Sequence, residues 1–110
     1  MSVVAVVDDM FFASKIRATA EAVGVEISFP RTKESLIEKA RQADLVIVDL
    51  QNQKIDPLTL PAELGSSQLL GFFSHVEVEL QRNAIAAGYQ RVIPRSVFAR
   101  DLAQILTSAN

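Results

Sequence analysis

The sequence predicts an α/β protein with a central parallel sheet and helices on both of its faces. Apolar runs rich in Val, Leu and Ile occupy 2–7 and 44–50, and their lack of polar alternation is typical of strands covered on both sides. Stretches whose apolar residues recur at helical spacing lie between such runs. Because strands and helices alternate along the chain, we expect parallel strands joined by right-handed crossovers.

Three strands and two helices are predicted in the first half of the chain. In order, they are a strand over 2–7, a helix over 12–23, a strand over 25–29, a helix over 32–43 and a strand over 44–50. Gly24 ends the first helix, as glycine commonly does. Thr32 is a favourable N-cap for the second helix. Leu36, Ile37 and Ala40 share one face of that helix and are expected to be buried.

The second half begins with an irregular connection and continues with two strand–helix pairs. Asp56 and Pro57 predict a cap followed by proline at the first helical position, and Pro61 excludes a long helix, so the third helix should be short. The later elements are a strand over 69–73, a helix over 74–87, a strand over 91–93 and a helix over 97–106. The residues expected to face inward from the last two helices are Val76, Leu80, Ala84, Ala87, Phe98, Leu102, Ile105 and Leu106.

Five strand–helix units in 110 residues fit one flavodoxin-like domain spanning 1–110. This architecture has three layers (αβα), a five-stranded parallel sheet of order 2-1-3-4-5 and, in this chain, a shortened third helix. Ligands in such folds bind beyond the carboxyl ends of the strands, where the first and third strands are neighbours.

Composition excludes several classes of function. The net charge of −2 without a large basic block argues against nucleic-acid binding. The absence of cysteine and the single histidine, His75, exclude thiolate and multi-histidine metal sites. No apolar run reaches the roughly 18 residues that span a bilayer, and no signal peptide or fused output domain is evident, so we expect a soluble, cytoplasmic protein. The four glycines form no dinucleotide or nucleotide-binding loop.

Three carboxylates follow strands that the predicted topology makes adjacent. Asp8 and Asp9 come directly after the first strand, and Asp49 lies at the end of the third. They are expected to converge in one crevice, where they form a hard-oxygen site that suits Mg²⁺. The charge of the ion would make such a cluster of like charges tolerable.

Two further polar side chains follow strands at the same edge. Ser74 comes after the fourth strand and Arg95 after the fifth. A carboxylate nucleophile surrounded by a metal ion, a hydroxyl and a guanidinium is the arrangement that phosphoryl transfer needs.

These motifs resemble the receiver domains of response regulators (the CheY-like superfamily) over essentially the whole chain. The matching stretches are VVDD at 6–9, DLVIVDL at 44–50, GFFS at 71–74 and AAGYQRVIPRS at 86–96. The resemblance implies that Asp49 is the phosphoacceptor and that Asp8 and Asp9 bind Mg²⁺ together with Asp49 and the backbone carbonyl of Gln51. It also implies that Ser74 is the switch hydroxyl and that Arg95 takes the place of the family's lysine.

The chain departs from the receiver pattern at several of these positions, so what it resembles is an atypical single-domain receiver. Arg95 replaces lysine, and its planar guanidinium differs from a compact ammonium. Pro94 precedes this cation, whereas in the family a proline follows it. Val92 stands where receivers have an aromatic switch residue, and the bulky His75 follows Ser74.

The resemblance implies a two-component phosphorelay. A histidine kinase or phosphotransfer protein would phosphorylate Asp49, and a conformational switch would signal to a separate effector protein. Self-phosphorylation and self-dephosphorylation would at most be slow. The surface formed by 74–87, 91–93 and 97–106 would report the change and would also be the surface for any homodimer. No nucleic acid or membrane partner is expected.

Simpler structural roles are open for each of these residues. Asp8 and Asp9 are favourable caps for the first helix. Ser74 and Glu77 have the spacing of a capping box. Arg95 is also interpretable as a solvated surface cation.

Two other functions are also open. A pseudo-receiver would keep the fold as a phosphorylation-independent interaction or dimerisation module. A small phosphatase with an aspartyl intermediate fits less well, because haloacid-dehalogenase enzymes separate their two aspartates by one residue, whereas Asp8 and Asp9 are adjacent.

Overall fold

A computed structural model describes residues 2–52, 54–65 and 68–107, which form a five-stranded parallel sheet with helices on either side. The strands are β1 (Ser2–Val6), β2 (Glu26–Ser28), β3 (Leu45–Asp49), β4 (Leu69–Phe73) and β5 (Arg91–Pro94). The helices are α1 (Met10–Ala22), α2 (Lys33–Ala40), α3 (Leu60–Leu64), α4 (Val78–Ala87), α5 (Arg95–Arg100) and α6 (Leu102–Thr107). Within these ranges, none of the helices combines the length and the hydropathy that crossing a membrane requires.

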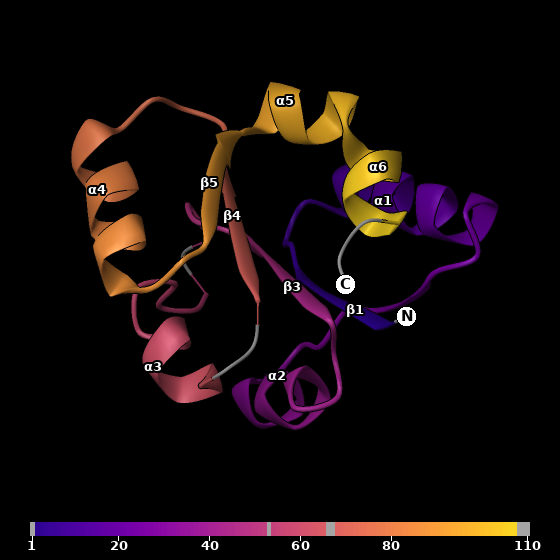
Figure 1. The fold of residues 1–110 in the computed structure, drawn as a ribbon, viewed down its shortest axis with the longest axis horizontal. Coiled ribbons are helices and arrows are strands. Elements are labelled where there is room, and N and C mark those ends of the chain that lie inside the picture. Colours follow the sequence, from indigo (N-terminus) through magenta and orange to yellow (C-terminus); the bar gives the residue numbers. More distant parts are fainter. Residues whose placement is uncertain (1, 53, 66–67, 108–110) are drawn as a thin grey trace.

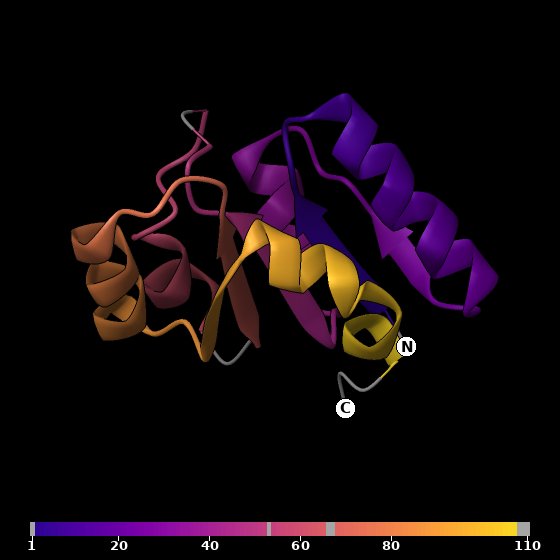
Figure 2. The same cartoon turned by 90° about the horizontal axis from the view of Figure 1, so that it is seen from above.

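The sheet has the predicted strand order, β2-β1-β3-β4-β5, with every neighbouring pair parallel. Figures 1 and 2 show the three layers, with α1, α5 and α6 on one face and α2, α3 and α4 on the other. The fold class predicted from the sequence is confirmed, including the short third helix of five residues.

Alternate residues of the inner strands supply two separate cores. Val3, Ala5 and Ile47 pack beneath α1, α5 and α6, whereas Val4 and Val48 pack beneath α2, α3 and α4. The Val-rich runs therefore lack polar residues because both faces of the sheet are covered. This burial fixes the register of the strands, and with it the positions of their carboxyl ends.

Three phenylalanines connect α1, β4 and α5 just beneath the carboxyl edge of the sheet. The rings of Phe72 and Phe98 are stacked, with centroids 5.0 Å apart. The ring of Phe12 meets both edge-on, at 5.3 Å from Phe72 and 5.7 Å from Phe98. These are favourable aromatic geometries, and they hold the starts of α1 and α5 together.

The predicted starts of the last two long helices are wrong. The helix predicted over 74–87 begins at Val78, so Val76 lies outside it and is 77% exposed instead of buried. The capping box of Ser74 and Glu77 does not form, because Glu77 is itself the N-cap and Ser74 is bonded elsewhere. The helix predicted over 97–106 begins two residues earlier and is interrupted at Asp101, although its four predicted core residues are buried.

The connection between β3 and α3 also differs from its prediction. Pro57 does not start a helix; Asp56 Oδ1 instead accepts the N–H of Leu58 at 3.2 Å in a turn. Pro61 lies in the first turn of α3, where its missing N–H costs nothing. The buried Tyr89 hydroxyl donates to the carbonyl of Pro57 at 2.7 Å and anchors this connection to the end of α4.

Candidate functional site

The predicted site residues all follow strands at the same edge of the sheet. Asp49 is the last residue of β3, and Asp8 and Asp9 follow β1, which pairs directly with β3. Ser74 follows β4, and Arg95 is the first residue of α5. The parallel topology therefore places these five residues at one edge of the sheet. The single crevice expected from the sequence does not form, because Asp8 and Arg95 line separate grooves.

Asp9 has two structural roles at once. Its Oδ1 caps α1 by accepting the N–H groups of Phe11 at 2.9 Å and Phe12 at 3.2 Å. This explains why α1 begins at Met10, two residues before the predicted start. Its Oδ2 pairs with Arg95 Nη2 at 3.1 Å. The Phe12 N–H and the Arg95 guanidinium both lower the pKa of the Asp9 carboxyl.

Arg95 is not a free surface cation. Besides its bond to Asp9, its guanidinium carbon lies 4.1 Å from the ring centroid of Phe12. A planar guanidinium can stack on an aromatic ring and bind a carboxylate at the same time, which an ammonium does less well. An arginine at this position therefore makes two contacts together that a lysine would make less well.

Asp49 is half-buried at the end of β3. Its Oδ1 accepts the backbone N–H of Gln51 at 3.0 Å. Burial raises the pKa of Asp49, and the charges of Asp8 and Asp9 add to this effect, while the Gln51 N–H and Arg95 oppose it. Asp49 thus lies within electrostatic range of both other carboxylates and of the guanidinium.

Asp8 is paired with a lysine that the sequence had not indicated. Lys54 Nζ, from the connection after β3, lies 3.0 Å from Asp8 Oδ1. Both side chains are largely exposed, at 76% and 51%. Each member of the acidic pair is therefore neutralised by a basic side chain of the same chain: Asp8 by Lys54 and Asp9 by Arg95.

The donor set fits Mg²⁺ in its chemistry, because three carboxylates and the carbonyl of Gln51 are hard oxygen ligands. The arrangement of the side chains is less suited to the ion. Over 2–52, 54–65 and 68–107, no three acidic or histidine side chains converge closely enough to hold a metal. Lys54 pairs with one oxygen of Asp8 and Arg95 with one oxygen of Asp9, so a cation at these carboxylates would compete with two ion pairs.

Ser74 lies in the loop between β4 and α4, where its backbone is fixed by the side chain of Gln51. Gln51 Oε1 accepts the N–H of Ser74 at 2.7 Å and that of His75 at 3.2 Å, and Nε2 donates to the carbonyl of His75 at 2.9 Å. Gln51 was predicted to act through its backbone carbonyl alone, and nothing in the sequence indicated this use of its side chain.

The open groove beside Arg95 contains Ser74 as well. It has a volume of about 540 Å³, and α1 contributes Phe11, Phe12 and Lys15 to its wall. Asp8 and Lys54 instead line a separate groove, of about 620 Å³, on the other side of the start of α1. The site is thus divided by the first turn of α1.

The chain matches solved structures in its fold, but its sequence matches no known family. No protein-family model matches the chain, and no curated protein matches it significantly. A response regulator from Hahella chejuensis matches with a TM-score of 0.83 at 15% identity, over 98% of this chain and 93% of its own. A response regulator from Thermotoga maritima matches with a TM-score of 0.76 at 16% identity, over 98% of this chain and 95% of its own. The chain has the receiver fold.

Another structure with the receiver fold contains a modified aspartate. It is a response regulator from Burkholderia pseudomallei described as having a phosphorylated aspartic acid, a calcium ion and citrate. It matches with a TM-score of 0.76 at 13% identity, over 97% of this chain and 66% of its own. At such identities the likeness concerns the fold, and the chemistry of this chain has to be argued from its own residues.

Sequence reasoning missed Lys54, Phe12 as the partner of Arg95, and the side chain of Gln51. A signal for Lys54 does exist. In the receiver fold the connection after β3 leaves the sheet at the edge that carries Asp8, so a basic residue in that connection is a candidate counterion. No comparable spacing rule identifies the contact between Phe12 and Arg95, because it depends on the packing of α1 against α5.

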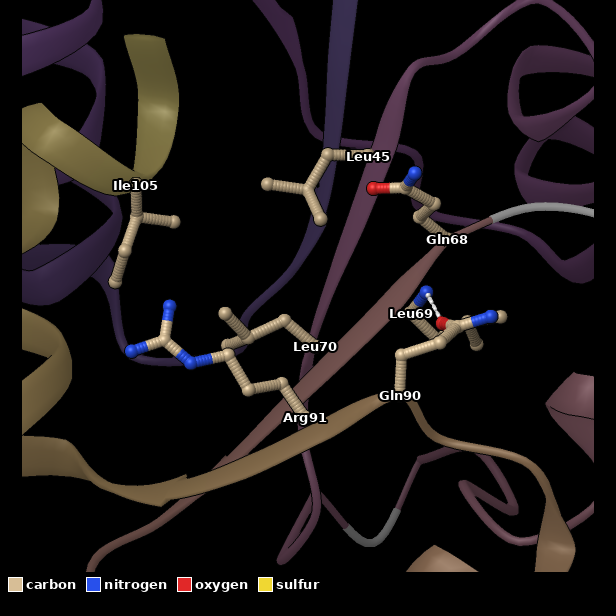
Figure 3. A pocket seen from close by; sticks show the side chains of 7 residues that line it. All are labelled: Leu45, Gln68, Leu69, Leu70, Gln90, Arg91 and Ile105. Atoms are coloured by element: carbon tan, nitrogen blue, oxygen red, sulfur yellow. Dashed lines mark hydrogen bonds between the residues drawn. The ribbon is translucent and has the colours of Figure 1, made fainter. Parts of the chain in front are cut away.

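A further hollow, distinct from these two grooves, lies at the opposite edge of the sheet and is shown in Figure 3. It has a volume of about 190 Å³, with Leu45, Leu70 and Ile105 projecting into it and Arg91 along one side. It contains none of the predicted site residues. The predicted site residues lie at the carboxyl edge instead.

Proposed function

We propose that the chain is an atypical receiver that accepts a phosphoryl group on Asp49. The observation that carries this proposal is the position of Asp49 in the receiver fold: it is half-buried at the carboxyl end of β3, within electrostatic range of Asp8, Asp9 and Arg95. The donor would be a histidine kinase or a phosphotransfer protein, and the signal would pass to a separate effector protein in the cytoplasm.

The proposed reaction uses the carboxylate of Asp49 as the nucleophile. Oδ1 is engaged by the N–H of Gln51, so Oδ2 is the oxygen that would attack phosphorus. The Oδ2–P bond forms as the bond between phosphorus and the donor imidazole nitrogen breaks, and the electron pair stays on that nitrogen. Arg95 supplies positive charge for the phosphoryl oxygens, which requires it to leave Asp9.

Magnesium would be held by Asp8, Asp9, Asp49 and the carbonyl of Gln51, and it would neutralise charge on the phosphoryl oxygens. The release of Lys54 and Arg95 from the acidic pair would accompany its binding. Ser74 would need to move toward the phosphoryl group, and its backbone is at present held by Gln51.

A second candidate function is that of a pseudo-receiver, an interaction or dimerisation module that needs no phosphorylation. Two observations favour it. Lys54 and Arg95 neutralise the acidic pair without a metal ion. Val92, which takes the place of the aromatic switch residue, packs against the core beneath α2, α3 and α4 instead of forming a movable aromatic group.

Amide NMR with Mg²⁺ and beryllofluoride, a phosphoryl mimic, separates the two candidates. The receiver predicts large shifts at Asp49, Ser74 and Arg95 that are absent from Asp49→Asn. Asp44→Asn is the matched control, since Asp44 precedes the same strand at the opposite edge and should leave the response intact. Spectra that do not change in the wild-type protein would favour the pseudo-receiver.

A further inference from the structure

We propose that the side chain of Gln51 is a latch that couples Asp49 to the loop carrying Ser74. In this account Gln51 is a positioning residue, and it acts through hydrogen bonds made at both of its ends. The latch joins two connections that are 23 or more residues apart in the sequence, the one after β3 and the one between β4 and α4.

The first link of the latch connects Asp49 with the backbone of Gln51. Asp49 Oδ1 accepts the N–H of Gln51 at 3.0 Å, so the conformation of the Gln51 backbone depends on that carboxylate. A carboxylate acceptor makes a stronger hydrogen bond than a neutral one, and a change at Asp49 therefore alters this link directly.

The second link connects the Gln51 side chain with the loop. The amide satisfies two adjacent N–H groups and one carbonyl of Ser74 and His75, at 2.7, 3.2 and 2.9 Å. The amide of Gln51 both accepts hydrogen bonds from this loop and donates one to it. These bonds together fix the position and the orientation of the loop. Residues 74–77 are exposed and lie between β4 and the first turn of α4, so these bonds are a main restraint on their path.

The latch offers a route from Asp49 to the loop that does not involve Val92. A bond between phosphorus and Asp49 would disturb the first link and release the second, which would free Ser74 to move. This signalling role rests on the proposed function, whereas the coupling itself is a property of the protein without any ligand and is testable in that state.

A double-mutant cycle on the unmodified protein tests the coupling. The rates of amide–solvent exchange at Ser74 and His75 would be measured by NMR in the wild type, Asp49→Ala, Gln51→Ala and the double variant. Gln51→Ala should raise both rates by about 5-fold, as expected for the loss of a hydrogen bond. When Gln51 is present, Asp49→Ala should raise the same exchange rates by roughly 2-fold. When Gln51 is already replaced by Ala, Asp49→Ala should leave these rates unchanged.

Gln90→Ala is the matched control. Gln90 Oε1 accepts the N–H of Leu69 at 2.6 Å at the opposite edge of the sheet, and Figure 3 shows this bond. Its removal should leave exchange at Ser74 and His75 unchanged. The proposal is overturned if Asp49→Ala changes the exchange rates at Ser74 and His75 equally in the wild-type and Gln51→Ala backgrounds. It is also overturned if Asp49→Ala changes these rates in neither background. These exchange measurements are made without phosphorylation, so a failure of the latch is distinguishable from a failure of the proposed function.

Discussion

Arg95 Nη2 lies 3.1 Å from Asp9 Oδ2, so an ion pair joins the start of α5 to the start of α1. The same guanidinium stacks on Phe12, and we expect that contact to be the part of the arrangement that stabilises the fold. Arg95→Ala should lower the free energy of unfolding by about 0.5–1 kcal/mol through loss of the contact with the ring. Urea denaturation measures this change. Arg82→Ala, on the exposed face of α4, is the control, and an equal loss in both variants would contradict a specific role for Arg95.

Lys54 competes with a metal ion for Asp8 in this account. Lys54→Ala should therefore strengthen Mg²⁺ binding, by about 5-fold for the loss of one nearby positive charge in water. Isothermal titration with Mg²⁺ measures the affinity. Lys39→Ala makes the same change of charge in the last turn of α2 and should have no comparable effect. Equal affinities for the wild type and Lys54→Ala would show that the lysine does not restrict the site.

The raised pKa of Asp49 predicts how its replacement changes stability with pH. Between the ordinary value of 3.8 and the raised value, the native state binds more protons than the unfolded state, so stability falls as pH rises through that window. The ionised, half-buried carboxylate therefore destabilises the fold at neutral pH. Asp49→Asn keeps an acceptor for the N–H of Gln51 and removes this charge.

Thermal unfolding at several pH values checks this expectation. The melting temperature of Asp49→Asn should exceed that of the wild type at pH 7, and the difference should vanish as the pH falls below 3.8. A wild-type protein that is the more stable of the two at neutral pH would show that ionised Asp49 is well compensated by its surroundings.

The regular part of the fold was predictable because burial leaves a direct signature in the sequence. The runs that became β1, β3 and β4 are apolar at successive positions, and their end residues followed within one or two positions. Asp49 was placed at a strand end for the same reason. Its proximity to Asp8 and Asp9 then followed from the strand order alone.

The errors arose where a tertiary contact overrides local sequence preference. Ser74 has the spacing of a helix cap, yet Gln51 binds its N–H and the helix starts four residues later. The apolar side chain of Val76 fits a helical stripe, but it lies outside α4 and is exposed. The pairing of Lys54 with Asp8 depends on the path of an irregular connection, which has no periodicity from which it could be predicted.

Gly71 lies in β4 where the side chain of Leu50 leaves no room for another. A Cβ atom at this position would lie 2.8 Å from three carbon atoms of Leu50. Gly71→Ala should therefore lower the free energy of unfolding by about 1–3 kcal/mol through overpacking. Combining it with Leu50→Ala should cost less than the sum of the two single changes, which urea denaturation of all three variants would measure. Strict additivity would contradict the contact.

The central claim is that Asp49 accepts a phosphoryl group, and phosphotransfer from acetyl phosphate in the presence of Mg²⁺ tests it most directly. Intact-protein mass spectrometry would follow the wild type, Asp49→Asn and, as the control, Asp44→Asn. The account predicts one added phosphoryl group on the wild type and on Asp44→Asn, and none on Asp49→Asn. A wild-type protein that gains no phosphoryl group, or an Asp49→Asn variant that is labelled as fully as the wild type, would contradict it.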